Sequence, residues 1–577
     1  MKNLKNLKLE YLFALLLFFT VNSCDEDIEI EVTSAFASDL VLSTPEQLEL
    51  LLLSTYNSTD SWGMNKQNWW GRRFNIEIAS FEAKFNFNNL DLARERAGWT
   101  AGNAGLFNNK WGQLWTYVRE ANLFLELAQD SQAMEQDPDA VNQLIAEMRF
   151  LRANLYTKLL KYYGGVPILT RTYALDDDFD IPRNTYEECV DFIVSELDAA
   201  AALLPETRPD AELGRATSMA ALAVKSRTLL YAASDLHDPA LAPQTSNKEL
   251  YTYSNANKWQ DAANAAKAVI DMVGGRDLIT TPSATAYQSL FLTPNQDMIF
   301  VRPYGGSLFD YGTDANTLWD KTQSPRGFDG WGLSTPTHNY VLEYNMADGT
   351  TTSDAGYDPL DPYTGREMRF YANINYQGAE FRGRAIDYSL AADTPNAALD
   401  GADSESLALD FGNFRHWSRT GYHIRKFQDE GIPITGISAK RPYILYRLAE
   451  IYLNYAEAQA ELGNDAEARI YLNKVSSRAL QPDITAGGTE LLEAIKRERR
   501  VELAFEGHNF FDERRWMNEP HLGMDIIGLL WTKHPDLSVT STEYTVATRP
   551  WTDSRMYYLP IPQSEIDRST LVQNDGY

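Results

Sequence analysis

The residues that come nearest to an acid–base constellation lie in one short stretch towards the C-terminus. Three glutamates and an arginine follow one another there at helical spacing: Glu498, Arg499, Glu502 and Glu506. Carboxylates held close together can act as general acids and bases. However, a predicted helical hairpin just upstream would bring Glu450 and Glu457 beside this group. Because a buried charge without a partner is very costly, we interpret the group as a structural network of ion pairs.

No other stretch of the sequence has the residues of a catalytic site. A His-Glu-x-x-His pair, a Gly-x-Ser-x-Gly elbow and a Walker loop are all missing. Gly330-Trp331-Gly332 begins like a dinucleotide loop but lacks the third glycine. With 80 acidic residues, some pair of carboxylates will always look suitable for glycoside hydrolysis. We therefore predict a protein that is not an enzyme, with no catalytic residue, no metal ligand and no cofactor.

Structural calcium is the one alternative left open for a cofactor. Two acidic loops could supply the oxygen ligands that calcium prefers, although neither fits the EF-hand pattern. These loops contain Asp354, Asp358 and Asp361, and Asp400, Asp403 and Glu405. Solvated loop residues are the simpler interpretation of both groups.

Aromatic side chains suggest binding instead of catalysis. The chain has 13 Trp and 31 Tyr, and two regions without clear periodicity, residues 61–105 and 304–331, are rich in such rings and read as loops. Flat rings can stack on sugar rings or on bases. A formal net charge of -28 argues against nucleic acid, because phosphate would be repelled. The alternative for each ring is burial beneath the loops.

Helices must position these residues. Residues 441–516 read as three consecutive helices, and the first has Ile444, Leu448, Ile451 and Tyr455 along one face. Gly463 ends this helix, and the short connection predicts an antiparallel hairpin with the next one.

Further helices precede this block. Residues 106–275 show successive apolar helical faces, and Thr185 and Glu188 form a capping box. Antiparallel pairs of this kind predict tetratricopeptide-like stacking with degenerate repeats. Between about 276 and 440 the periodicity fades, and we expect a subdomain of short strands and turns, with strands at 368–376 and 422–427.

The N-terminus carries a secretion signal. Lys2, Lys5 and Lys8 precede an apolar segment, residues 11–21, that is too short to span a membrane. The residues up to Cys24 resemble a bacterial lipobox, so we predict cleavage of residues 1–23 and lipidation of Cys24. The only other cysteine, Cys189, lies on an apolar helix face and is expected in the core.

Several long segments, in order, resemble the SusD/RagB family, which comprises surface lipoproteins that capture nutrients for Bacteroidetes. The segments are RLAEIYLNYAEA (447–458), LNKVSSRA (472–479), ERRVELAFEGHNFFDERRW (498–516), RFLRANLYTKLLKYYGGVPI (149–168), GRATSMAALAVKSRTLLYAA (214–233) and YYLPIPQSEID (557–567). The resemblance spans nearly all of the mature chain. It implies a mostly α fold, a SusD-like array of tetratricopeptide-like helix pairs with a large irregular insertion of loops and short strands.

This resemblance also implies an organisation and a function. A signal peptide (1–23) would precede one domain (24–577), composed of a tether with aromatic loops (24–105), helix pairs (106–275), a ligand-binding insertion (276–440), a C-terminal helix block (441–516) and a final segment (517–577). The expected function is to bind oligosaccharides and pass them to a SusC-like TonB-dependent transporter. The protein would be lipid-anchored in the outer membrane, facing outwards, since the acidic residues after Cys24 look like the export signal of lipoproteins in this bacterial group. By region, the ligand-binding residues would be Trp99, Asn103, Tyr304, Trp319 and Trp331.

Two other functions remain open at this stage. Peptide capture, as in RagB-like relatives, would need a long cleft with backbone hydrogen-bonding groups. A protein-interaction scaffold would use the concave surface of the helix pairs and have no small-molecule site.

Overall fold

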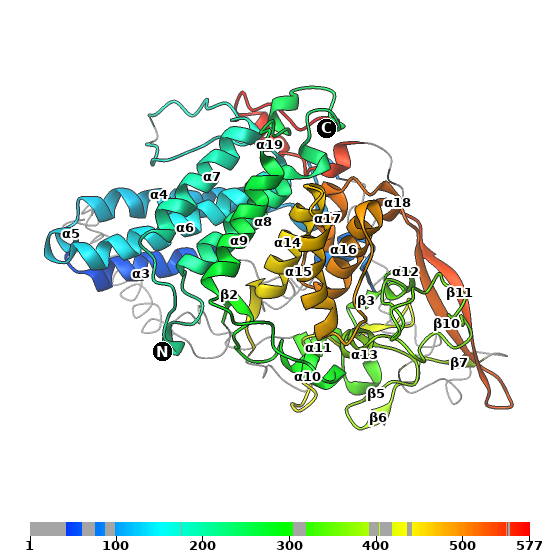
Figure 1. Ribbon diagram of the computed structural model, residues 1–577. Coiled ribbons are helices and arrows are strands. Elements are labelled where there is room, and N and C mark those ends of the chain that lie inside the picture. The colour runs from blue at the N-terminus through cyan, green and yellow to red at the C-terminus, as the bar shows by residue number, and fades with distance from the viewer. Residues whose placement is uncertain are drawn as a thin grey trace, which may run out of the picture.

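The computed structural model describes residues 42–59, 76–86, 99–174, 176–303, 319–391, 403, 418–434, 441–549, 551 and 554–577. Paired helices fill one side of the molecule, and short strands and turns fill the other (Figure 1). The predicted signal peptide, Cys24 and Tyr304 lie outside the described residues.

The first side is an array of antiparallel helices, each packed on the next. In chain order these helices are α3 (Pro45–Thr55), α4 (Lys110–Gln129), α5 (Gln132–Gln136), α6 (Pro138–Tyr163), α7 (Tyr186–Ala201), α8 (Ser218–Ala233) and α9 (Lys258–Met272). Their apolar faces form the largest hydrophobic cluster of the described residues. The predicted capping box is confirmed, because the Thr185 hydroxyl accepts from Glu188 N at 3.1 Å and the Glu188 carboxylate accepts from Thr185 N at 2.8 Å. Cys189 is fully buried, as predicted.

The C-terminal helix block continues the array, with one correction to the prediction. Its helices are α14 (Leu448–Glu461), α15 (Asp465–Arg478), α16 (Gly488–Glu502) and α17 (Asn509–Arg515), and α14 packs on α9. Residues 443–447, predicted as the first turn of a helix, form strand β9 (Tyr443–Arg447) paired with β2 (Met298–Arg302). Leu448 N donates to Asp297 O at 2.8 Å, so the helix begins where the strand pairing ends. Ile444 therefore lies in a strand.

The insertion is a compact subdomain of short elements, as predicted for its described residues. It contains helices α10 (Ala284–Ser289), α11 (Trp319–Gln323), α12 (His338–Val341) and α13 (Met368–Asn373), and strands β3 (Ser334–Pro336), β4 (Ile374–Asn375), β5 (Glu380–Phe381), β6 (Arg384–Ala385), β7 (Leu390–Ala391) and β8 (His423–Ile424). The predicted strand at 368–376 is wrong over most of its length, because residues 368–373 are helical and only Ile374 and Asn375 pair, with β8. Buried aromatic rings form a second core here.

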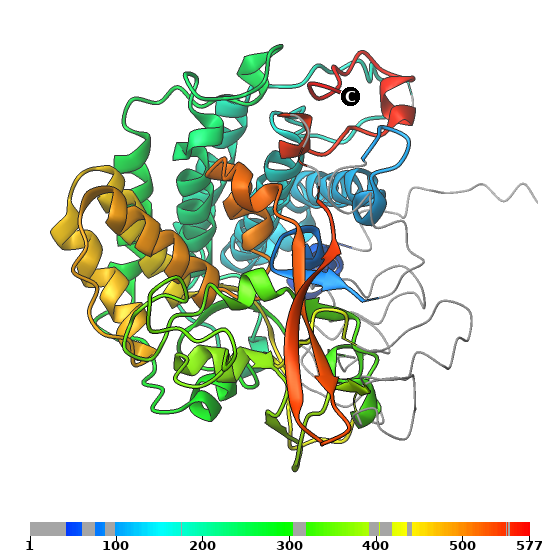
Figure 2. The ribbon, with the colours of Figure 1, turned by 90° about the vertical axis from the view of Figure 1, so that its right-hand side faces the viewer.

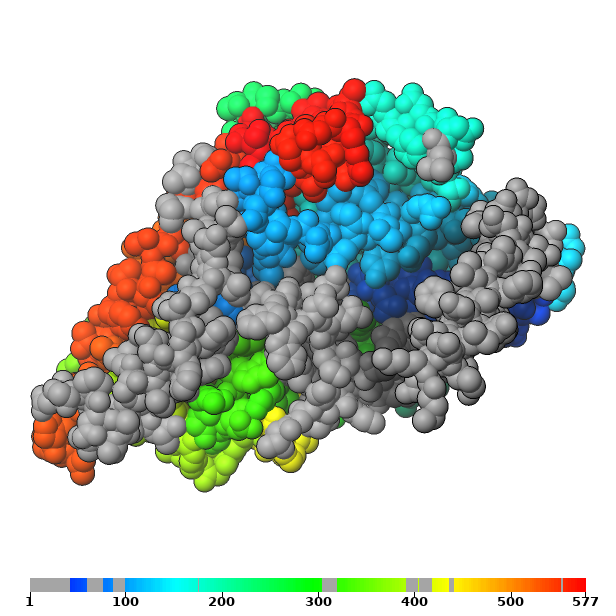
Figure 3. Space-filling model, turned by 180° about the vertical axis from the view of Figure 1, so that it is seen from behind, coloured from blue at the N-terminus to red at the C-terminus, as the bar shows by residue number. Residues whose placement is uncertain are grey.

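A long C-terminal hairpin lies along the edge of this subdomain (Figures 1 and 2). Its strands are β10 (Ile526–Lys533) and β11 (Val539–Ala547), and β7 pairs in parallel with the other edge of β10. Strand β1 (Ala83–Phe85) pairs with β3, close to the short helix η2 (Ile76–Ala79). Seen from behind, the hairpin forms one rim of the molecule, and the C-terminal segment with α19 (Gln563–Ile566) lies over the first helices (Figure 3).

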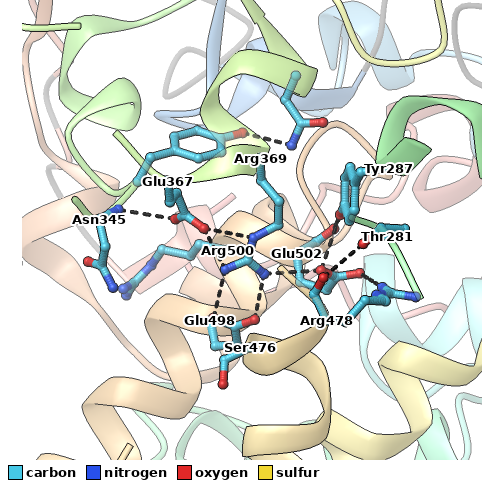
Figure 4. A network of polar contacts seen from close by, with 12 residues as sticks. Thr281, Tyr287, Asn345, Glu367, Arg369, Ser476, Arg478, Glu498, Arg500 and Glu502 are labelled. Carbon is cyan, nitrogen blue, oxygen red and sulfur yellow. Dashed lines mark hydrogen bonds and ion pairs between the residues drawn. The ribbon is translucent and has the colours of Figure 1, made fainter. Parts of the chain in front are cut away.

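Buried ion pairs hold these parts together, as predicted (Figure 4). The Glu502 carboxylate accepts hydrogen bonds from Arg369 of α13 at 3.0 Å, from Arg447 of β9 at 2.6 Å and from Arg478 of α15. Burial would raise the pKa of Glu502, but the three arginines hold it well below its usual value. Glu498 is paired with the same Arg369 at 2.5 Å. One carboxylate therefore connects the insertion to the helix block.

The rest of the predicted charged group is also paired and buried. Its contacts are Arg499 with Asp512, Glu506 with Arg447 and Lys426, Glu450 with Arg227, and Glu457 with Arg515. Since each of these side chains has a partner within the protein, the interpretation of the group as structural is confirmed.

Candidate binding site

The β10–β11 hairpin brings two distant pieces of chain together at its base. Ile526 at the start of β10 is opposite Ala547 at the end of β11. Asp525 therefore lies beside the residues that follow β11, and its carboxylate accepts from Arg549 N at 3.1 Å. Helix α18 (Glu519–Leu522) immediately precedes this turn and places Glu519 on the same rim.

These residues surround an open hollow of about 530 Å³. Its lining consists of Glu519, Gly523, Asp525, Thr548, Arg549 and Trp551. Gly523 allows a close approach here, because a Cβ atom at this position would lie 3.2 Å from the Cβ of Trp551. The hollow falls within the size range of ligand pockets in proteins.

The Trp551 ring is held from two directions. Arg514 of α17 lies 5.6 Å from its ring centroid, and Tyr557 meets it edge-on at 5.0 Å and 74°. Arg514 is buried and donates to Met556 O at 3.2 Å and to Phe510 O at 2.8 Å. Burial lowers the pKa of Arg514 to about 9. The ring is thereby fixed in place by the protein itself.

The chemistry of this lining suits a ligand rich in hydroxyl groups. Glu519, Asp525 and Thr548 are exposed and can accept or exchange hydrogen bonds, and the half-buried indole of Trp551 offers an apolar surface beside them. Among the described residues, no group of three His, Cys, Asp or Glu side chains is arranged to hold a metal ion. None of the helices in the described part of the chain is long and apolar enough to cross a bilayer.

Trp99 does not have the role predicted for it. Its side chain is 1% exposed and packs edge-on against Phe107 at 5.6 Å, with Arg514 over its ring at 5.6 Å. A ring covered in this way cannot stack on a ligand. Asn103 is half-buried in a tight turn, where its side-chain oxygen accepts from Gly105 N at 2.9 Å. Its binding role stays a prediction.

Of the two tryptophans predicted in the second aromatic region, Trp319 is buried and Trp331 is half-buried. Trp319 is 1% exposed, donates from Nε1 to Lys426 O at 3.0 Å and packs against Phe427, so its predicted stacking role is also corrected. Trp331 packs against a small apolar cluster, and its role in ligand binding stays a prediction. Trp99 and Trp319 therefore fill the core beneath the loops. Burial is the alternative to ligand binding that the large size of the rings favours.

Arg514 lies between Trp99, which the sequence predicts as a binding residue, and the observed hollow. It contacts the rings of both Trp99 and Trp551, so the hollow lies next to the predicted region although its residues come from the C-terminal segment. Sequence reasoning missed Trp551, Glu519 and Asp525. The available signal was a Thr-rich alternating strand at 539–547 followed directly by the aromatic and basic segment 548–552.

The acidic residues considered for calcium make contacts within the protein where they are described, and the calcium site stays a prediction. Asp354 accepts from Thr351 within a turn, and Asp358 accepts from Leu360 N at 2.9 Å. Asp403 forms an ion pair with Arg384 at 2.8 Å. Asp400 and Glu405 lie outside the described residues.

Comparisons with known proteins agree with this architecture. The paired helices and the inserted subdomain define a helix-rich, tetratricopeptide-like scaffold. The model of the SusD family matches residues 297–577, and a second model, described as starch-binding and associating with the outer membrane, matches residues 35–230. The chain belongs to the SusD/RagB family.

Individual relatives cover nearly the whole chain. A SusD-like protein of Bacteroides fragilis has 27% sequence identity and a TM-score of 0.74, over 93% of this chain and 98% of that one. A structure named as a SusD-like carbohydrate binding protein, also from Bacteroides fragilis, has 26% identity and a TM-score of 0.73, over 92% and 99%. The SusD-like protein P38 of Formosa agariphila is 23% identical over 92% of this chain and 97% of its own length.

Proposed function

We propose that this protein is a lipoprotein of the outer membrane that binds oligosaccharides without hydrolysing them and delivers them to a SusC-like TonB-dependent transporter. The description of the second family model, starch-binding and associated with the outer membrane, supports the ligand class and the location. The Bacteroides fragilis relative that is named carbohydrate binding supports the same ligand class.

The observation that carries the proposal is the hollow at the base of the hairpin. An indole ring, two exposed carboxylates and a hydroxyl group surround a space of about 530 Å³. Sugar rings bind to such surfaces through their apolar faces and their hydroxyl groups. Capture and delivery require affinity only, so no reaction centre is needed for this function.

The location rests on the N-terminal sequence. Cleavage before Cys24 and acylation of this cysteine would attach the protein to a bilayer, and more than one acyl chain is needed for stable attachment. The acidic residues that follow Cys24 would direct the protein to the outer face. Mass spectrometry of the mature N-terminus tests this part of the proposal.

Calorimetric titration of the soluble mature chain against neutral and acidic polysaccharides tests the ligand. Binding to at least one glycan is expected, and Trp551→Ala should weaken it about tenfold, because a stacked ring contributes on the order of 1 kcal/mol beyond its buried area. Trp331→Ala in parallel tests the position predicted from the sequence. Binding of peptides alone would favour a RagB-like function, no binding would favour a scaffold, and release of reducing sugar would contradict the proposal.

A further inference from the structure

Strand β11 lies at the edge of a three-stranded sheet, in the order β11, β10, β7. Within the part of the chain that the structure describes, no strand pairs with its outer side. Its nine residues, Val539 to Ala547, are mostly exposed and contain neither proline nor lysine. The one irregularity of its pairing with β10 is at Val546, near its C-terminal end, so residues 539–545 keep a regular edge. Proteins normally protect such edges by these residues or by bulges, because unpaired backbone groups invite a further strand.

The backbone groups that face outwards follow from the hydrogen-bonding pattern. His534 N donates to Ser538 O at 2.8 Å, which makes this a hydrogen-bonded pair, and such pairs alternate along an antiparallel ladder. Leu529 and Glu543 are then a non-bonded pair. Leu529 N indeed points away from β11, to Thr420 O at 3.0 Å. The N–H and C=O groups of Val539, Ser541, Glu543 and Thr545 therefore point outwards.

Glu543, at the centre of this edge, keeps its negative charge uncompensated. Its side chain is 58% exposed, and its Oε1 lies 3.3 Å from His338 Nε2. Burial lowers the pKa of His338 to about 4, so the ring is neutral at neutral pH and supplies no positive charge. No lysine or arginine among the described residues forms an ion pair with Glu543.

The charge of Glu543 argues against pairing of this edge with β11 of a second copy of the chain. Antiparallel pairing of two β11 strands with full overlap would place the two Glu543 side chains opposite each other, and like charges in that position are destabilising. Each copy also carries a net charge of -28. A basic segment of a different protein avoids both penalties.

We propose that an extended segment of a partner protein adds to the outer edge of β11 as a fourth strand, with a lysine or arginine beside Glu543. The inference deepens the proposed function and rests on it, because the partner expected there is the transporter barrel. The backbone of β11 provides the hydrogen bonds, and Glu543 selects the register of the added strand. The exposed Leu537, next to the strand at the hairpin tip, extends the contact.

Co-purification from the native outer membrane tests this inference. The tagged full-length protein is isolated from cells that also make the barrel, and the amount of barrel recovered is measured by mass spectrometry. Ser541→Pro removes one outward donor and should reduce recovery at least about tenfold. Ser541→Ala keeps this donor and should not change recovery. Glu543→Lys should reduce recovery, whereas Glu206→Lys, an equal charge change in an exposed loop, should not.

A photo-reactive residue at position 545 identifies what lies beside the strand. Cross-linking to the barrel supports the inference even where Ser541→Pro lowers the melting temperature of the isolated protein. Cross-linking of two β11 strands, unchanged recovery of barrel with Glu543→Lys and Ser541→Pro, or no barrel recovered with the wild-type protein would each overturn it. Glycan titration of the same variants separates the two proposals. Absence of glycan binding would count against the proposed function, whereas recovery of the barrel reports on the added strand.

Discussion

A buried carboxyl beside the helix block should make the stability of this protein fall as the pH rises. Glu77 lies in η2 and is 2% exposed. Burial raises its pKa from 4.5 to about 7, opposed by backbone N–H groups, including that of Gly507, and reinforced by Glu506. Glu82, also buried, has its pKa raised well above the usual value, first by burial and then by Glu77. At pH 5 the Glu77 carboxyl is therefore protonated in the folded protein.

The sign and size of the effect follow from linkage. Because the pKa of Glu77 is raised in the folded state, the contribution of this carboxyl to the free energy of unfolding is fully present below about pH 4.5. It is lost as the pH rises through about 7. At 1.36 kcal/mol for each pH unit between these values, the complete loss is about 3 kcal/mol. Glu77→Gln removes this titration. Its advantage in free energy of unfolding over the wild type should therefore grow by about 2–3 kcal/mol between pH 5 and pH 8.5.

Urea unfolding followed by tryptophan fluorescence at a series of pH values measures this difference. Glu206→Gln, which removes an exposed carboxylate from a loop, is the matched control and should show no such trend. If the difference between Glu77→Gln and the wild type stays constant within about 0.5 kcal/mol over this range, the carboxyl does not hold a proton in the folded state and the reasoning is refuted.

Three further predictions concern the network, the hollow and the buried thiol. Glu502→Gln should lower the free energy of unfolding by about 3–5 kcal/mol, because three buried guanidinium groups lose their shared carboxylate; a loss below about 1 kcal/mol in urea unfolding would contradict this. Gly523→Ala should weaken glycan binding several-fold in calorimetry, because the added Cβ must displace Trp551. Gly356→Ala is its control, with open space around the added atom. Burial raises the pKa of the Cys189 thiol to about 12, so a colorimetric thiol reagent at pH 8 should react with this residue only after unfolding, and a fast reaction of the folded protein would refute the placement.

The helical part of the fold was predictable because its signals are local. Amphipathic faces, the Thr185 capping box and the spacing of Glu498 and Glu502 depend on neighbours within a few turns, and the structure confirms each of them. The apolar spacing of α14 extends back to Ile444 and predicts a helix there, but pairing with β2, far away in the sequence, makes this segment a strand.

The binding site was less predictable because it depends on the register of a hairpin. Glu519, Asp525 and Trp551 meet only after β10 and β11 pair. The burial of Trp99 and Trp319 depends likewise on rings and loops from other parts of the chain. Composition indicated that rings were abundant, but it could not assign individual rings to the surface or the core.

The carboxylate of Glu502 has a consequence for how the loops of this protein could change. It joins α13, β9 and α15, so this joint between the inserted subdomain and the helix block is made by buried charges and not by outer loops. Loops elsewhere in the subdomain could be lengthened, shortened or exchanged without disturbing this joint. The outer loops and the joint can therefore vary independently, and chimaeras that carry loops of relatives should keep the stability of the parent protein.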